Sequence, residues 1–390
     1  MTPSMSIITD TKSLTDFCER LSKSTFVTVD TEFMRERTYW PQLCLVQLAN
    51  DDEAMAIDAL AEGIDLTPLL KLMADESVLK VFHAARQDLE IFYKLDAKLP
   101  TPLFDTQVAA MVCGFGESVG YETLVNKLVG EPIDKSSRFT DWSARPLTEK
   151  QVVYALGDVT HLRTIYEALE AKLVESGRHE WLNEEMAKLT NRNIYEAPPR
   201  EAWRRIKARS PKPRFLAVLR EVTAWRETEA QRKDLPRNRI LRDEALVEIA
   251  HNSPKTTNDL ARIRGLGQRL AEGNAGESIL KAVEAGRNLP DHECPEVPRG
   301  PNLPRGIGPV TDLLKVLLKM KCEQQDVAQK LIASGDDLEK IAAYGEQADV
   351  SALTGWRRPL FGQDALNLRE GKLALVINGL TLELVEIDDE

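Results

Sequence analysis

The sequence has 390 residues, 43% hydrophobic and 29% charged; at about 150 residues per domain this suits two or three packed domains and excludes general disorder. With 51 Lys and Arg against 62 Asp and Glu, the formal net charge is −11, which is untypical of a nucleic-acid binder over the whole chain. No apolar run approaches the roughly 20 residues of a membrane-spanning helix, the N-terminus lacks the apolar core of a secretory signal, and the five cysteines include no CxxC pair. We therefore expect a soluble, cytoplasmic protein with no membrane partner and no structural zinc site.

The first part of the chain predicts a mixture of strands and helices. Apolar and β-branched runs predict strands at 26–29, 43–48, 54–57 and 78–82. The polar joint Asn50–Asp52 between the second and third runs is typical of a hairpin. Apolar residues recur at helical spacing in 66–73, 88–95 and 152–165. This order predicts an α/β layer domain that ends near residues 190–198.

The rest of the chain is mainly helical between proline-containing breakers. Two breakers lie at 197–199 and 210–213, and a Pro- and Gly-rich linker extends from Pro290 to Pro309. The predicted domains are therefore an α/β domain over 1–198 and two all-α helical domains over 210–290 and 305–390. The last of these ends in a Val- and Leu-rich tail, Leu373 to Val385.

Positive charge is concentrated in one part of this acidic chain. Residues 199–242 carry 14 basic and 5 acidic side chains, a net charge of +9. Such a block suggests local docking of a polyanion. The alternative is a solvated helix face between domains.

Asp30 and Glu32 form an acidic pair at the end of the first predicted strand. Strand side chains alternate between faces, so the two carboxylates point the same way and repel each other. A divalent hard cation removes this repulsion, because carboxylate oxygens are its preferred ligands. The alternative is a solvent-facing acidic strand end.

Two further motifs contribute acidic groups. Asp88 follows a predicted strand, where it could bind metal or cap a helix, and His83 at the start of this motif is interpreted as structural. Tyr154 and Asp158 are four residues apart on a helical pattern and therefore share a face; the alternative is an exposed acid beside a half-buried phenol. Four carboxylates from a strand, a loop–helix junction and a helix, with one tyrosine, suit two-metal phosphodiester cleavage.

The order of these motifs resembles the DEDDy branch of 3′–5′ exonucleases, which have a ribonuclease H-like fold. Residues 20–175 are similar to the ribonuclease D family in particular. The stretches that carry this resemblance are FVTVDTEFMRERTYWPQLCLVQLA (26–49), VFHAARQDLEIF (81–92), FDTQVAAMV (104–112) and TDWSARPLTEKQVVYALGDVTHL (140–162).

The resemblance implies a metal-dependent 3′–5′ exoribonuclease that processes RNA, in particular the 3′ ends of tRNA precursors; we expect it to act as a monomer. By motif, Asp30, Glu32 and Asp158 would hold the first of two Mg²⁺ or Mn²⁺ ions, and Asp30 would bridge to the second. Asp88 would act on the second ion through water, and Tyr154 would position the attacking water. These five residues are the predicted catalytic residues, and the four carboxylates are the predicted metal ligands.

Residues 210–290 resemble the HRDC module, the helical domain shared by RecQ-type helicases and the ribonuclease D C-terminus, and residues 305–390 resemble a divergent second copy. The stretches that carry this resemblance are 214–220, 224–226, 235–241 and 260–267. Gly265 and Gly267 would let a tight turn approach a phosphate, or serve the geometry of a helical corner alone. We expect Trp203, Trp225 and Phe215 to pack in a core rather than stack on bases.

Two other functions remain open from the sequence. A 3′–5′ exonuclease acting on DNA would carry the same motifs, although the chain has no P-loop to indicate a helicase. A non-catalytic RNA-binding scaffold with a decayed nuclease domain would have lost a metal carboxylate, and all four are present together with Tyr154.

Overall fold

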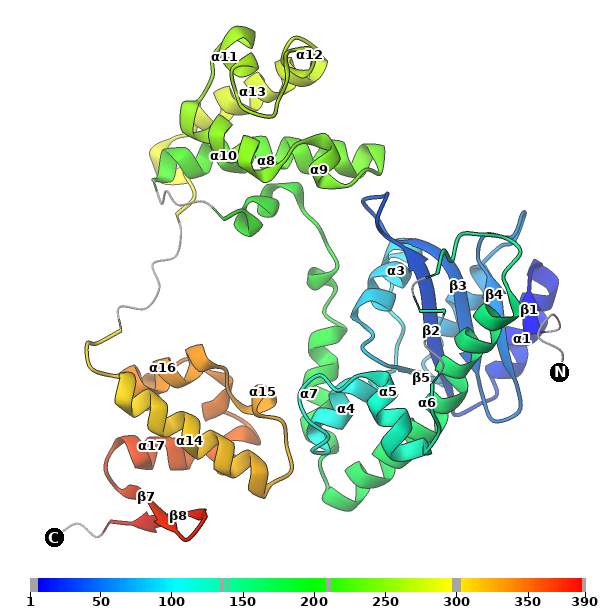
Figure 1. Ribbon diagram of the computed structural model, residues 1–390, viewed down its shortest axis with the longest axis vertical. Coiled ribbons are helices and arrows are strands. Elements are labelled where there is room, and N and C mark those ends of the chain that lie inside the picture. The colour runs from blue at the N-terminus through cyan, green and yellow to red at the C-terminus, as the bar shows by residue number, and fades with distance from the viewer. Residues whose placement is uncertain (1–5, 134–136, 139, 208–211, 297–302, 388–390) are drawn as a thin grey trace.

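The structure, a computed structural model, describes residues 6–133, 137–138, 140–207, 212–296 and 303–387. Figure 1 shows an α/β body (residues 6–198), a middle helical body (residues 199–296) beyond one end of it, and a C-terminal body (residues 303–387) on another side. The predicted fold class, an α/β domain followed by helical parts, is confirmed. Among the described residues, no helix is both long and apolar enough to cross a membrane.

The α/β body is built on the strands β1 (Ile7–Ile8), β2 (Phe26–Met34), β3 (Gln42–Ala49), β4 (Ala54–Asp58), β5 (Leu79–Phe82) and β6 (Leu103–Asp105). They form one sheet in the order β1-β4-β3-β2-β5-β6. β2, β3 and β4 are antiparallel neighbours, β5 and β6 continue parallel to β2, and β1 is parallel to β4. The four predicted strands are confirmed; the sequence does not predict β1 and β6, because two or three residues are too few to show alternation.

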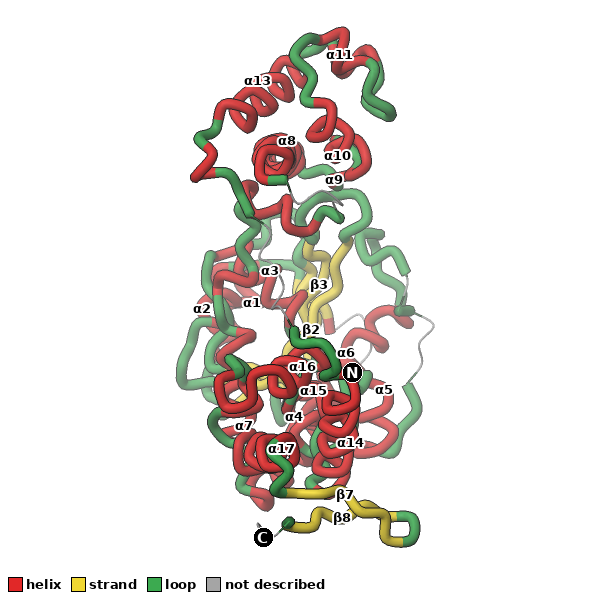
Figure 2. Tube along the Cα trace, turned by 90° about the vertical axis from the view of Figure 1, so that its left-hand side faces the viewer, coloured by secondary structure: helices red, strands yellow, loops and turns green. Residues whose placement is uncertain are grey.

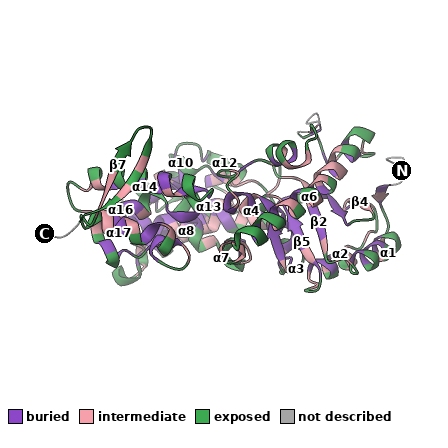
Figure 3. Ribbon diagram, turned by 90° about the horizontal axis from the view of Figure 1, so that it is seen from below, coloured by how far each residue is buried: buried purple, intermediate pink, exposed green. Residues whose placement is uncertain are grey.

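Helices cover both faces of this sheet. They are α1 (Thr11–Leu21), α2 (Thr67–Met73), α3 (Arg86–Asp96), α4 (Thr106–Val112), α5 (Tyr121–Leu124), α6 (Glu149–Ser176) and α7 (His179–Leu189). Figure 3 shows β5 as largely buried, and β2 as buried in its first half and half-buried towards its end.

The long helix α6 lies across β2, β3 and β4 on one face. It begins at a capping box, in which the Thr148 and Gln151 side chains each bond the other residue's backbone N–H, and it ends at Gly177 in the left-handed conformation. Its buried apolar residues follow the predicted helical spacing from Val152 to Ile165. The middle of α6 is thereby held against β2, the strand that carries Asp30.

The middle helical body has a core of its own. Its helices are the 3₁₀ helix η4 (Pro199–Arg205), α8 (Pro213–Lys233), α9 (Arg237–Ile240), α10 (Asp243–Asn252), α11 (Thr257–Ala261), α12 (Gln268–Ala271) and α13 (Asn274–Asn288). Trp203 and Phe215 are buried in this core and Trp225 packs against it, so the packing predicted for these three residues is confirmed. The breaker residues 210–211 and part of the 290–309 linker lie outside the described residues.

The connection between β2 and β3 attaches the middle helical body to the α/β body. The hydroxyl of buried Tyr39 bonds the Glu227 carboxylate and accepts a hydrogen bond of 2.9 Å from Arg237. The backbone N–H groups of Tyr39 and Trp40 both donate to Asp234 Oδ1 at 3.0 Å. Hydrogen bonds to ionised groups are stronger than neutral ones, so this contact ties the middle helical body to the strand that carries the acidic pair.

The C-terminal body packs directly on the α/β body. It consists of α14 (Gly308–Gln324), α15 (Gln329–Ile332), α16 (Gly335–Tyr344), α17 (Gln363–Arg369), β7 (Leu373–Asn378) and β8 (Thr381–Glu386), with shorter turns between them (Figure 2). Its buried apolar residues join the core cluster of the α/β body. Trp356 stacks on Trp181 of α7 with ring centroids 4.2 Å apart. A Cβ at Gly114, which has φ +79°, would lie 2.6 Å from the Asp326 carbonyl oxygen, so the backbones meet closely there.

The tail at 373–385 differs from the helical prediction for this part. It forms the antiparallel hairpin β7–β8, closed by a turn at Gly379 with φ +64°. Leu375, Leu382 and Leu384 pack against the body, while Ile377 is 76% exposed. The short apolar run at 373–377, the Asn378-Gly379 turn and the alternating segment at 381–384 are strand and hairpin signals, and they account for the hairpin.

Candidate active site

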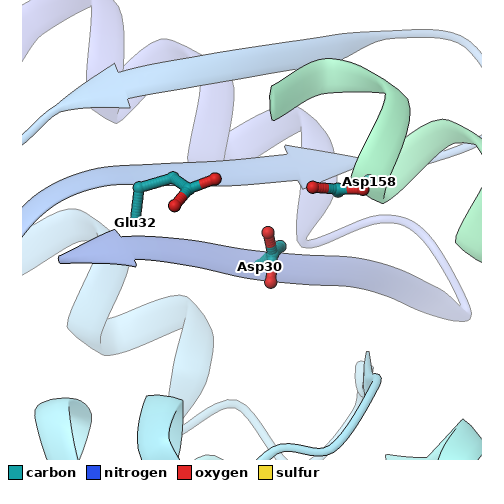
Figure 4. Close-up of side chains that lie close together, drawn as sticks. All are labelled: Asp30, Glu32 and Asp158. Carbon is teal, nitrogen blue, oxygen red and sulfur yellow. The ribbon is translucent and has the colours of Figure 1, made fainter. Parts of the chain in front are cut away.

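Three of the four predicted carboxylates meet where β2 passes the middle of α6. Asp30 and Glu32 are two residues apart on β2, and Asp158 comes from α6 (Figure 4). One oxygen from each carboxylate lies within 4.8 Å of the others. The alternation along β2 and the packing of α6 thus produce a compact group of acidic ligands, which we call the carboxylate cluster.

Asp88 lies beside the carboxylate cluster rather than within it. It is the third residue of α3, is 7% exposed, and accepts a hydrogen bond from the Thr31 hydroxyl. Its carboxylate also bonds its own backbone N–H in the first turn of α3, so a role at the helix end stays open beside metal binding. Burial raises the pKa of Asp88, and the nearby Asp30 carboxylate raises it further.

The carboxylate cluster holds its protons more tightly than ordinary carboxyl groups do. Burial raises the pKa of Asp30 to about 7. Burial and the charge of Asp30 raise the pKa of Asp158 to about 8, although Tyr154 and Arg138 act in the opposite direction. Burial, followed by the charges of Asp30 and Asp158, raises the pKa of Glu32 to about 10.

These properties fit a divalent cation. Without a metal, these carboxylates repel one another and have lost part of their hydration, and both effects raise the free energy of the site. A hard cation offsets the repulsion and replaces the lost hydration. Asp30, Glu32 and Asp158 provide such a donor set in one place. The site can therefore hold a divalent metal ion between β2 and α6.

Tyr154 lies one helical turn before Asp158, as the spacing predicts. A hydrogen bond joins its phenol to the Asp158 carboxylate, and burial, followed by the Asp158 and Glu32 charges, raises the pKa of Tyr154. Its ring lies 6.1 Å from that of Trp142. Tyr154 is therefore a neutral phenol, and its hydroxyl is held beside the carboxylate cluster.

A cavity of about 380 Å³ opens in front of the carboxylate cluster. Its lining is formed by Asp30, Thr31, Glu32, His83, Gly120, Tyr121, Glu122, Thr123, Ile133, Arg138, Tyr154, Asp158 and Leu162. Tyr121 and Arg138 are not predicted from the sequence, because neither lies on a recognisable motif or periodic pattern. His83 Nδ1 lies 3.0 Å from Thr106 Oγ1, and burial lowers the pKa of His83; the structural interpretation of this histidine stays a prediction.

Much of the basic block at 199–242 is used within the middle helical body. Arg226 is buried against Asp243, Arg237 pairs with Glu227, and Arg214 donates to the carbonyls of Gly286, Arg287 and Leu289 at the end of α13. Five exposed members make no ion pair with other described residues: Arg205, Lys207, Lys212, Arg239 and Arg242.

Gly265 and Gly267 have φ of +82° and +75°, and a Cβ on either would meet nothing within 4 Å. Backbone conformation alone therefore accounts for these glycines. The alternative that this turn approaches a phosphate stays a prediction.

Two family models match the chain. A 3′–5′ exonuclease model matches residues 5–174, and an HRDC domain model matches residues 215–283. Ribonuclease D of Gluconacetobacter diazotrophicus is 51% identical over 98% of this chain and 97% of its own length. Ribonuclease D of a Jannaschia species is 51% identical over 97% of this chain and 99% of its own length.

Solved structures show the same architecture. The crystal structure of Escherichia coli RNase D, described as an exoribonuclease involved in structured RNA processing, matches with a TM-score of 0.79 at 31% identity over 94% of this chain and 98% of that chain. The catalytic core of RRP6 from Trypanosoma brucei matches with a TM-score of 0.55 at 20% identity over 72% of this chain and 79% of that chain, which shows a shared fold. The match to the first structure extends through all three bodies.

Proposed function

Because this chain belongs to the ribonuclease D family and is a 3′–5′ exoribonuclease, we propose that it trims the 3′ ends of structured RNAs, tRNA precursors in particular, by two-metal-ion phosphodiester hydrolysis. The observation that carries this proposal is the carboxylate cluster at the edge of a cavity of about 380 Å³.

The metal ions in this proposal are Mg²⁺ or Mn²⁺. Asp30, Glu32 and Asp158 would hold one ion, Asp30 would also serve the second, and Asp88 would act on the second ion through water. When bound, the ions neutralise these acidic groups and supply Lewis acidity to the phosphodiester. The short distances within the carboxylate cluster and the raised pKa values of its members support this assignment.

The protein's own side chains position the reacting groups around the carboxylate cluster. The hydrogen bond between Tyr154 and the Asp158 carboxylate fixes the phenol beside the carboxylate cluster, where it orients the attacking water. Arg138 brings a positive charge close to Asp158 and faces the same cavity, where the phosphate of the substrate would approach.

In this proposal the chain consists of an exonuclease domain over 1–198, an HRDC domain over 210–290 and a second, divergent HRDC-like domain over 305–390. The separate core of the middle helical body and its HRDC match support the second of these. The helices α14 to α17 support the third, although they share a core with the α/β body. We further propose that the chain acts as a monomer in the cytoplasm; its five cysteines are all free thiols.

The direct test uses a 5′-labelled RNA with a stem and a short 3′ tail, next to a DNA of matched sequence. Wild type and Asp30→Ala are incubated with each in Mg²⁺ or in EDTA. We expect a 3′-shortened RNA ladder that requires both Mg²⁺ and Asp30. Faster shortening of the DNA would favour the DNA exonuclease, and intact RNA and DNA in all lanes would contradict catalysis and favour an RNA-binding scaffold.

Tyr154→Phe is expected to slow cleavage by about a hundredfold at saturating Mg²⁺, because the positioned hydroxyl is lost while the ring is kept. RNA affinity measured in EDTA should remain nearly unchanged. Tyr93→Phe, which removes a hydroxyl that bonds Glu196, is the control and should cleave at the wild-type rate. A parallel loss of RNA binding in Tyr154→Phe would contradict the water-positioning role.

Reversal of two unpaired basic residues, Arg205→Glu with Lys207→Glu, is expected to weaken RNA binding and to reduce the slope of log affinity against log salt by about 2, because each phosphate contact releases about one counterion. Binding titrations at several salt concentrations measure this slope. The same double reversal at exposed Lys12 and Lys23 of the α/β body provides the control. An equal slope in both double variants would mean that residues 199–242 do not form the RNA-binding surface.

A further inference from the structure

Asp158 lies on a weak turn of α6. The preceding residue, Gly157, lies in the interior of this helix, where glycine is less favourable than alanine because it loses more backbone entropy. Packing does not require glycine there, since a Cβ at 157 would meet only the His161 ring, at the ordinary distance of 3.9 Å. The turn that must hold a metal ligand in place is therefore not stabilised by its own sequence.

Side chains from outside the helix anchor this turn. The Tyr121 hydroxyl lies 2.8 Å from the Asp158 carbonyl oxygen and 3.2 Å from that of Gly157, and it donates to them. The Thr28 hydroxyl donates to the Val159 carbonyl at 2.8 Å. Three consecutive carbonyls of α6 thus receive hydrogen bonds from α5 on one side and from β2 on the other.

The two anchors are themselves firmly held. Thr28 is fully buried on β2, two residues before Asp30, so its bond joins the two elements that supply the carboxylate cluster. The Tyr121 ring packs on the His83 ring with centroids 5.4 Å apart. His83 lies 3.0 Å from the Thr106 hydroxyl, which donates to the Phe82 carbonyl at the end of β5.

We propose that Tyr121 is a positioning residue that keeps Asp158 in its metal-binding place by anchoring residues 157 and 158 of α6, with Thr28 as its counterpart on β2; this inference rests on the proposed metal-dependent function. Tyr121 is not a metal ligand, since its hydroxyl donates to backbone carbonyls. It acts through the backbone of residue 158, because the carbonyl that it bonds and the metal-binding carboxylate belong to the same residue. Removal of its hydroxyl should loosen the carboxylate cluster while the cavity keeps its shape.

Tyr121→Phe is expected to bind Mn²⁺ about tenfold more weakly, the loss typical when a group that orients a metal ligand is removed. Calorimetric Mn²⁺ titration of the protein without RNA measures this directly. The Mg²⁺ concentration for half-maximal RNA cleavage should rise by the same factor, while the KM for RNA at saturating Mg²⁺ stays unchanged. Gly157→Ala, which strengthens the helix, should restore part of the lost Mn²⁺ affinity in the double variant.

The control is Tyr195→Phe, which removes a buried hydroxyl that donates to the Leu189 carbonyl at 2.7 Å, at the end of α7. It should bind Mn²⁺ as the wild type does. Wild-type Mn²⁺ affinity in Tyr121→Phe would overturn the inference, whereas failure of the wild type itself to bind Mn²⁺ would overturn the proposed metal site. If Tyr121→Phe does not fold, Thr28→Val provides the same test from β2, with the same expected loss of Mn²⁺ affinity.

Discussion

Asp30→Ala is expected to abolish exonuclease activity, by about a thousandfold or more, because the carboxylate shared by both proposed metal positions is lost and the ions contribute several kcal/mol to the reaction. The fold should persist. Since Asp30 is desolvated and lies next to Glu32 and Asp158, removal of its carboxylate relieves repulsion in the absence of metal. The unfolding temperature measured in EDTA at pH 8 should equal or exceed that of the wild type.

The pH dependence of stability provides a second measurement on the same variant. The pKa of Asp30 rises from 3.8 to about 7 on folding, so the folded state binds more protons than the unfolded state between these values. The stability of the metal-free protein is therefore highest at low pH within this window and falls as the pH rises through about 7. The raised pKa values of Asp158, to about 8, and of Glu32, to about 10, extend the fall to higher pH. Asp30→Ala should show a shallower fall, and saturating Mg²⁺ should reduce the fall in the wild type.

The matched control replaces Asp16, an exposed aspartate on α1, by alanine. This variant should keep full activity and the wild-type dependence of unfolding temperature on pH. A strong loss of stability in Asp30→Ala without metal would instead mean that the carboxylate cluster supports the fold.

Arg357→Ala is expected to lower the free energy of unfolding by about 3 kcal/mol, because one partner of a buried ion pair is removed. Arg357 is 2% exposed; it bonds Glu184 and, at 2.6 Å, both Glu185 and the Leu331 carbonyl oxygen. Its loss would leave the largely buried Glu185 with Lys188 as its remaining cation and would remove a link between the C-terminal body and α7. Glu184 is 45% exposed, so water can solvate its carboxylate once Arg357 is removed. The expected loss of stability is therefore at the lower end of the range for broken buried ion pairs.

Chemical denaturation and limited proteolysis of the C-terminal body would measure this effect. The neighbouring Arg358 serves as the control, since its pair with Glu346 is exposed and its replacement by alanine should cost no more than about 1 kcal/mol. Equal stability of the two variants would show that the Arg357 contact contributes nothing to docking of the C-terminal body.

The parts of the site that depend on local periodicity could be predicted from the residue pattern. Asp30 and Glu32 share a face because strand side chains alternate, and Tyr154 shares a face with Asp158 because a helical turn separates them. The apolar spacing from Val152 to Ile165 determined which side of α6 faces the sheet. These relations involve neighbours in the chain, so the residue pattern is sufficient to predict them.

Tertiary packing determines which distant groups meet. It placed Asp88 against Thr31 beside the carboxylate cluster, and it brought Tyr121 to the carbonyls of residues 157 and 158. It also joined the C-terminal body to the core of the α/β body and paired Arg226 and Arg237 internally, although the charge count alone made them candidates for RNA contact. The physical reason is that such contacts depend on how whole elements pack in three dimensions, and the spacing of residues within one element carries no information about its partner.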